Sequence, residues 1–513
     1  MPGTQQTGGS RPRPGMGGEG QGEQSRPRPA REESLNMRKI LLGTTAVVSA
    51  VVGSAVMAPQ ASAQEAPTVR IGGFFRAYYG YTQQSSRNSV TSTGLPQNVG
   101  GGTESIPGIG TSTTSTNNIA RLGKHDISTD AGIDVIVSGK LANGLTYGAQ
   151  ISLNSSGLEG RQLVQGRASA GKTTVAVDEM YAYIAHPRFG QVRFGDEDGV
   201  MGGLMNSGWV QGFGTGGVHG SWESFVTRQA GGRTTTAPGG LGDASKIIYM
   251  SPQFFGFDFG ASFAPNANVG EDTGCPNNAS SGYCDTAYAF SGARNFGIYA
   301  AGPEQNVKRN EVQAALRWRG NLAGVGLAAT VGYIGAGAAR DISTAGAQSR
   351  VFNGLNIWQV GAQASAYGFT VGANYTFGDY NFFWGSTMRG DRQAEQLTVG
   401  AQYTVGPFTI GSNFVTGLFE GGSRSSFTDS TTGPLVQGTC RPTVAGASNS
   451  CAGMRRWGVA VGGNYRLAPG MDLIAEWVHY SVREQGRDLD PNRPGVQSRA
   501  FSDVFILGTR IAF

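Results

Sequence analysis

The feature that most limits the fold is an alternation of apolar with small or polar side chains, which recurs from about residue 68 to the end of the chain. In LTYGAQISLN (145–154), for example, Leu, Tyr, Ala, Ile and Leu alternate with Thr, Gly, Gln, Ser and Asn. Successive side chains of a β-strand point to opposite faces of the sheet, so a period of two indicates strands. The chain is therefore expected to be built of β-structure.

Sixteen segments carry this pattern, and short turns containing Asn-Gly or Pro-Gly alternate with long loops rich in Gly, Ser and Thr. An even number of strands with alternating short and long connections is typical of an up-and-down antiparallel sheet. The predicted strands cover 68–81, 128–141, 145–154, 173–185, 190–196, 245–251, 256–264, 309–319, 324–335, 355–366, 369–378, 394–405, 407–419, 455–467, 471–484 and 500–513.

The two faces of these strands favour a membrane barrel over a soluble sandwich. One face carries Trp, Tyr, Phe, Leu and Val, and the other carries Gly, Arg, Asn, Gln and Thr. A transmembrane barrel turns its apolar face to lipid and its polar face to a wet lumen, and closure leaves no unpaired edge in the bilayer. Sixteen strands enclose a space wide enough for an aqueous channel. The sequence therefore predicts an all-β, 16-stranded antiparallel transmembrane β-barrel in the bacterial outer membrane.

The first 63 residues are expected to lie outside that barrel. Residues 1–36 hold almost nothing apolar and predict a disordered extension, which indicates that translation begins at Met37. Residues 37–63 have a basic start, an apolar stretch and the small residues Ala61 and Ala63, the pattern of a cleaved signal peptide. Removing 1–63 takes away seven basic and four acidic residues and leaves 33 and 31 in the domain 64–513. This near-neutral balance does not support a nucleic-acid partner.

Three stretches resemble the general diffusion porins of alphaproteobacteria, the Rhodobacter-type porin family. They are HDISTDAGIDVIVSGKLANGLTYGAQISL (125–153), DEMYAYIAHPRFGQVRFGDEDG (178–199) and GDASKIIYMSPQFFGFDFGASF (242–263). The resemblance implies sixteen strands, a homotrimer and passive diffusion of small hydrophilic solutes. It also implies that the segment between the strands near residues 195 and 245 folds into the lumen and narrows it.

Charged residues on this inward segment and on the strands are the candidates for ion selectivity. Acids on the loop opposite arginines on the wall would set a transverse field across the constriction. Alternatively, the acidic group could bind a divalent cation through its oxygens. The expected loop acids are Asp196, Glu197, Asp198 and Glu223, and the expected wall bases are Arg70, Arg76, Arg193, Arg317, Arg319, Arg456 and Arg466.

Cysteines and the last residue add evidence about location and assembly. Cys275 and Cys284 fall in one predicted outer loop, and Cys440 and Cys451 in another, which fits two local disulfides in an oxidising compartment. The sequence contains no C-x₂-C unit, so its cysteines do not suggest a zinc site. Phe513 ends an alternating strand and looks like the assembly signal of outer-membrane barrels.

Glycine makes up 83 of the 513 residues, and many glycines fall on the polar strand face, as at Gly332, Gly372 and Gly400. There a small side chain would keep the channel open. The function predicted is a porin that conducts ions and small hydrophilic solutes without catalysis or cofactor, with the lipid bilayer and lipopolysaccharide as partners. A channel specific for an anionic solute, a secreted glycine-rich adhesin and a barrel hydrolase remain as alternatives.

Overall fold

The computed structural model of the chain describes most of the predicted barrel. The described residues are 65–85, 88–90, 119–121, 123–155, 163–164, 167–168, 176–226, 244–265, 308–338, 353–380, 387, 392–419, 453–484 and 498–513. The predicted leader and signal peptide, with Ala61 and Ala63, lie outside these residues. So do the four cysteines, and their pairing stays a prediction.

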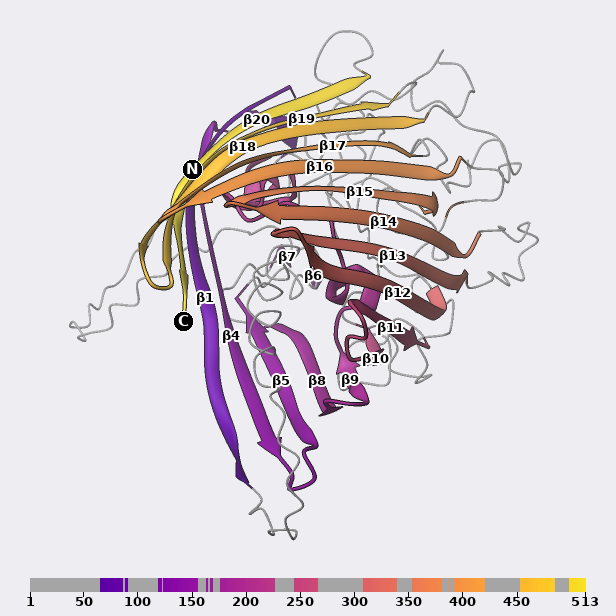
Figure 1. The fold of residues 1–513 in the computed structure, drawn as a ribbon. Coiled ribbons are helices and arrows are strands. Elements are labelled where there is room, and N and C mark those ends of the chain that lie inside the picture. The colour runs from indigo at the N-terminus through magenta and orange to yellow at the C-terminus, as the bar shows by residue number, and fades with distance from the viewer. Residues whose placement is uncertain are drawn as a thin grey trace, which may run out of the picture.

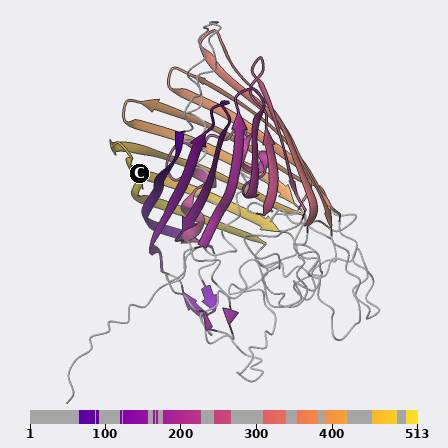
Figure 2. The same cartoon turned by 90° about the horizontal axis from the view of Figure 1, so that it is seen from below.

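Sixteen strands form one closed antiparallel barrel, in which each strand pairs with its neighbours along the chain and the last strand pairs with the first (Figures 1 and 2). Every one of the sixteen predicted segments corresponds to one of them. The barrel strands are β1 (Glu65–Gln84), β4 (His125–Lys140), β5 (Thr146–Asn154), β8 (Ala176–His186), β9 (Gly190–Asp196), β10 (Ser245–Met250), β11 (Phe257–Ala264), β12 (Lys308–Leu322), β13 (Val325–Ala338), β14 (Leu355–Ala366), β15 (Phe369–Asp379), β16 (Ala394–Val405), β17 (Phe408–Phe419), β18 (Met454–Ala468), β19 (Met471–Glu484) and β20 (Arg499–Ala512).

Two short pairs lie outside the barrel sheet. β2 (Asn88–Val90) pairs with β3 (Ile119–Arg121), and β6 (Leu163–Val164) pairs with β7 (Arg167–Ala168). None of the helices among the described residues is long and apolar enough to cross a membrane.

The outer face of the barrel is apolar, as the alternation predicts. In β11 the outward residues Phe257, Phe259 and Phe263 are 41–49% exposed, whereas Asp258 and Ser262 between them are buried inside. Exposed phenylalanines in such a row are suited to lipid, because apolar side chains gain nothing from contact with water.

Seven short connections join strands at one end of the barrel, which we call the short-turn end. They are 141–145, 187–189, 251–256, 323–324, 367–368, 406–407 and 469–470, and all seven are described. In the first, Gly144 adopts φ +83°, and the Asn143 side chain accepts a hydrogen bond from the Leu145 N–H at 3.1 Å. An Asn-Gly pair suits such a turn, because Gly enters the left-handed region without steric cost.

The barrel closes between its first and last strands. Phe74 pairs with Ala512 and Gln84 with Ser502. Beyond them, Gly73 and Phe513 exchange backbone hydrogen bonds of 2.9 and 3.1 Å. Phe513 therefore completes the β1–β20 seam, while its role as an assembly signal stays a prediction.

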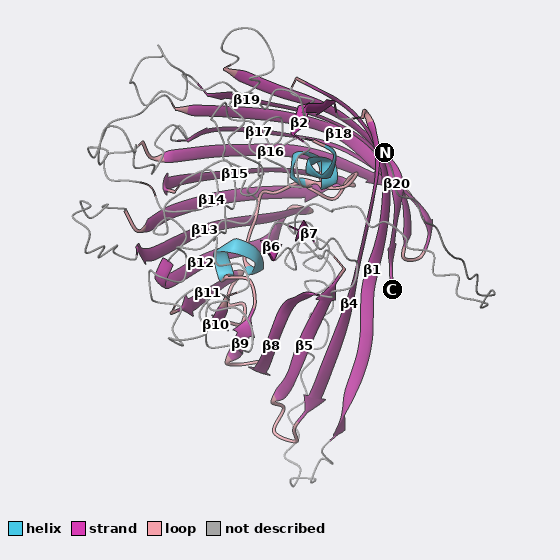
Figure 3. Cartoon of the chain, turned by 180° about the vertical axis from the view of Figure 1, so that it is seen from behind, coloured by secondary structure: helices cyan, strands magenta, loops and turns pink. Residues whose placement is uncertain are grey.

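The segment between β9 and β10 enters the barrel. We call its described part, residues 197–226, the inner loop. It contains a π-helical turn η2 (Val200–Leu204) and two 3₁₀ turns, η3 (Gly217–His219) and η4 (Ser221–Phe225). These coils lie within the space that the strands enclose (Figure 3). η2 contacts β11 to β13, η3 contacts β17 to β19, and η4 contacts β1, β4 and β20, so the loop follows the inner wall around much of the barrel.

Candidate functional site

The first half of the inner loop is fastened to the wall by polar side chains on successive strands. The Met201 N–H donates to Gln313 Oε1 of β12 at 3.0 Å. The Ser207 and Thr330 hydroxyls, on the loop and β13, lie 2.7 Å apart. Asn374 of β15 donates to the Ser207 carbonyl at 3.1 Å. Each hydrogen bond gives a partner to a polar group that is buried between the loop and the wall.

Asn413 of β17 fastens the middle of the loop with its whole amide group. Its Oδ1 accepts from the Val218 N–H at 2.9 Å. Its Nδ2 donates to the carbonyls of Val210 and Gly216, at 3.0 and 3.1 Å. One buried side chain thus holds the loop on both sides of the turn that leads into η3.

Glu476 of β19 and Asn464 of β18 hold the same turn from the two strands that follow β17. One carboxylate oxygen accepts from both the N–H and the hydroxyl of Thr215, each at 2.6 Å. Short hydrogen bonds to a carboxylate are among the stronger kinds. Asn464 of β18 adds an acceptor for the Gly214 N–H, and donates to the Gly212 carbonyl at 3.3 Å.

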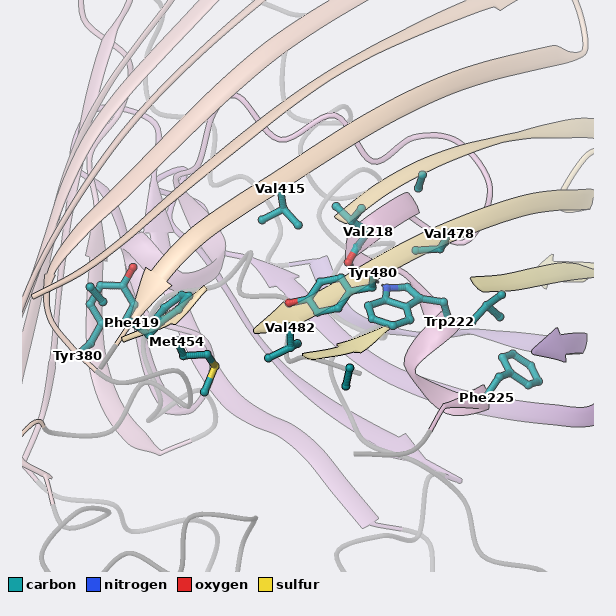
Figure 4. Packing of buried hydrophobic residues seen from close by; sticks show 14 of the residues in the cluster. Val218, Trp222, Phe225, Tyr380, Val415, Phe419, Met454, Val478, Tyr480 and Val482 are labelled. Carbon is teal, nitrogen blue, oxygen red and sulfur yellow. Dashed lines mark hydrogen bonds between the residues drawn. The ribbon is translucent and has the colours of Figure 1, made fainter. Parts of the chain in front are cut away.

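Apolar side chains fasten the end of the loop. The rings of Trp222 and Tyr480 lie side by side with centroids 4.7 Å apart (Figure 4). Val218 and Phe225 belong to the same buried cluster, together with the inward-facing Val478 of β19. The inner face of the barrel is therefore not uniformly polar. Where the end of the loop packs around Trp222, the wall is apolar on both faces.

Inward glycines make room for the loop rather than an open channel. A Cβ on Gly361 would lie 2.0 Å from the Ser207 carbonyl oxygen, and one on Gly411 would lie 2.2 Å from Phe213. Cβ atoms on Gly332 and Gly400 would lie 2.7 and 2.8 Å from loop side chains. Gly372 likewise faces the loop backbone, at 2.8 Å from the Gly208 oxygen. The expectation that Gly332, Gly372 and Gly400 keep the lumen open is thus wrong.

The acidic run begins where the inner loop leaves β9. Asp196 accepts a hydrogen bond from the Ser245 hydroxyl, and Glu197 pairs with Arg193 at 3.1 Å. The Lys246 ammonium donates to the backbone carbonyl of Glu197. Asp196, Glu197 and Asp198 are all buried, and Arg193 balances the charge of Glu197. Glu223 lies apart from them, half-buried in η4.

Glu197 and Asp198 meet a third acid, Glu179 of β8. One oxygen from each of the three lies within 4.8 Å of the others. Carboxylate oxygens are the ligands that Ca²⁺ prefers. Within the part of the chain that the structure describes, these three residues could hold the divalent cation considered from the sequence, with Glu179 in place of Asp196.

The wall arginines divide between two levels of the barrel. Arg193 forms a buried ion pair with Glu197, four residues further along the chain, so this pair lies on one side of the lumen rather than across it. Arg317 and Arg319 instead pair with Asp258, at 2.6 and 2.9 Å, and Arg466 lies 3.7 Å from Asp472, all near the short-turn end.

The remaining predicted bases lie on inward positions with other partners. Arg76 is buried, 3.9 Å from Asp130 and over the Phe74 ring. Arg456 is also buried, where it donates to Gln396 and to the Tyr480 hydroxyl. Arg70 is exposed near the short-turn end of β1.

Comparison with known families agrees with this architecture. A sequence model of the Gram-negative porins matches residues 44–485. The chain belongs to the Gram-negative porin family. It is accordingly a diffusion channel of the outer membrane.

Solved structures that match this porin share little sequence with it. They include a mutant of the Rhodobacter blastica porin (14% identity, TM-score 0.39), a loop-deletion mutant of an outer membrane protein of Vibrio cholerae (12%, 0.42) and an anion-selective porin from Comamonas acidovorans (12%, 0.45). The alignments cover 87%, 88% and 87% of this chain, respectively, and 100% of each of those chains. No curated protein matches the chain in sequence.

A histidine of the porin's inner loop is buried without a hydrogen bond. Among the described residues, neither ring nitrogen of His219 has a hydrogen-bond partner. Burial, with the Arg456 guanidinium as a second cause, lowers the pKa of His219 to about 3. The imidazole is therefore neutral in the docked loop at ordinary pH.

Sequence reasoning missed the residues that seat the loop. Asn413, Asn464 and Glu476 stand 195 to 261 residues from the loop atoms they bind. Nothing local distinguishes them from other polar inward residues. The one available signal is an acid at an inward position of β19, where Glu476 interrupts the apolar run Ile474 to Val482.

Proposed function

We propose that this porin conducts ions and small hydrophilic solutes passively, as a homotrimer in a lipopolysaccharide-containing membrane and without catalysis. The observation that supports it best is the inner loop seated on the wall by hydrogen bonds from β12 to β19, which narrows the lumen without needing to move. Planar-bilayer recording of the purified protein tests it. Current proportional to voltage and solute concentration is expected, with steps in threes if the trimer inserts as a unit.

A channel specific for an anionic solute would behave differently. Its conductance would saturate, and one solute would block the current of others. Saturable conductance would therefore contradict general diffusion and favour the specific channel.

Ion selectivity is proposed to depend on the acidic run and its wall partners. The place of the run supports this, because it lies where the inner loop leaves β9 and enters the barrel, and fixed charges at that level act on passing ions. Replacing Asp196, Glu197 and Asp198 with Asn, Gln and Asn should shift the reversal potential in a salt gradient toward anions. An unchanged reversal potential would remove this run from the selectivity mechanism.

A further inference from the structure

The short-turn end of the barrel carries an excess of basic side chains. All seven connections there are described, and their single charged residue is Arg188. Exposed Arg70 lies close by, at an inward-facing position of β1, whereas the exposed Lys140 of β4 lies opposite the acid Glu65. The short turns of such barrels face the periplasm.

One inward triad at this end holds two arginines and one aspartate. Asp258, the second residue of β11, lies opposite Arg317 of β12. Arg317 binds it through two nitrogens, at 3.1 and 2.6 Å, and Arg319 binds the same carboxylate at 2.9 Å. One carboxylate neutralises one guanidinium, so the triad keeps a charge of +1. Arg319 is the more exposed arginine, at 42%.

A second triad repeats this arrangement on β18, β19 and β20. Asp472 of β19 lies opposite both Arg466 of β18 and Arg510 of β20. Arg510 binds it at 2.7 Å, and Arg466 lies at 3.7 Å with 71% of its side chain exposed. Here too one positive charge is left over and faces water.

We propose that these triads, with Arg70 and Arg188, form an anion-concentrating vestibule at the periplasmic mouth, which makes ion selectivity depend on the direction of the salt gradient. The occupants are small inorganic or carboxylate anions. The triad arginines and Arg70 lie on inward strand positions, so their field acts on the pore entrance. The inference rests on the proposed function, since it needs an open channel, and goes beyond it by giving the two mouths different selectivity.

Salt screening supplies the test. The Debye length is about 10 Å at 0.1 M salt and about 3 Å at 1 M, so fixed charges at a mouth act mainly when that side is dilute. A mouth potential of about 1 kT enriches monovalent anions roughly threefold and depletes cations equally. The ratio of chloride to potassium permeability should therefore be about threefold or more higher when the periplasmic mouth faces the dilute side.

The experiment measures the reversal potential of single channels in 1 M against 0.1 M KCl, then with the gradient reversed on the same channel. The double variant Arg319→Gln, Arg466→Gln removes two of the four surplus charges and should lose about half of the difference between directions, while leaving the pairs Arg317–Asp258 and Arg510–Asp472 intact. The variant Arg319→Lys, Arg466→Lys should keep it. Arg392→Gln is the matched control, because Arg392 is an exposed, ion-paired arginine at the other end of the barrel.

Equal permeability ratios in both directions would overturn the proposal. So would a difference that the glutamine pair retains in full, that the lysine pair abolishes, or that Arg392→Gln removes. Wild-type protein that forms no channel at all would instead overturn the proposed function and, with it, the vestibule.

Discussion

Gly361→Ala should unseat the inner loop, because the glycine lies directly under the loop backbone. The added Cβ would fall 2.0 Å from the Ser207 carbonyl oxygen, about 1 Å inside the closest approach that real Cβ atoms make. The loop must therefore retreat by about that distance. Its bonds at this point, from Asn374 to the Ser207 carbonyl and between Ser207 and Thr330, would stretch from 3.1 and 2.7 Å beyond bonding range.

The cost can be estimated from these contacts. Overpacking at a tight site costs roughly 1–3 kcal/mol. Two lost hydrogen bonds add about 1 kcal/mol each. Docking of the loop near Ser207 should thus weaken by roughly 3–5 kcal/mol, enough to populate a released state.

Single-channel recording reads out this release. A freed segment inside the lumen should lower the mean open conductance and add frequent brief closures. Gly326→Ala is the matched control: it adds the same methyl group to an inward position of β13, where the nearest atom is 3.6 Å away. If Gly361→Ala had the same open conductance and the same frequency of closures as Gly326→Ala, the argument that inward glycines seat the loop would be refuted.

Three further changes probe the same seat. Asn413→Ala removes three hydrogen bonds to the loop and should weaken docking by roughly 3–5 kcal/mol, seen as more closures than in wild type; unchanged gating would show that the amide does not hold the loop. Glu476→Gln keeps an acceptor for Thr215 but loses the charge, so a smaller effect of about 1 kcal/mol is expected, whereas Glu476→Leu should approach Asn413→Ala. His219, with its pKa lowered from about 6.5 to about 3, binds fewer protons in the docked loop than in a released one between those pH values, so docking should weaken as the pH falls from 6.5. At pH 4.5 the loss is roughly 2.7 kcal/mol, and His219→Phe should abolish it; closures that rise equally with acid in the variant would assign the effect to other groups.

The barrel could be predicted from the sequence because its information is local. Each strand has one face against lipid, so alternation within ten to fifteen residues marks it, and the ends are misjudged by only a few residues. The first strand, for instance, was expected over 68–81 and spans Glu65–Gln84. A short-turn pair such as Asn143-Gly144 marks where the chain reverses.

The loop seat could not be predicted, because its partners meet only through tertiary structure. Alternation places Asn413 and Gly361 on the inner face but does not say what lies against them. An inward glycine gives the same sequence pattern whether it faces water or a carbonyl oxygen. The arginine partners show the same limit: Arg317 is inward by pattern, but its pairing with Asp258 depends on the register of β11 against β12.

The residues that hold the inner loop also order the events of folding. The loop lies between β9 and β10, but its anchors Asn413, Asn464 and Glu476 lie on β17 to β19, up to 261 residues later. Contacts this distant in sequence form late, because the intervening chain must first be placed. Trp222 reaches the Tyr480 ring only when β19 is in position. The change in Trp222 fluorescence on burial should therefore report the end of barrel assembly rather than its beginning.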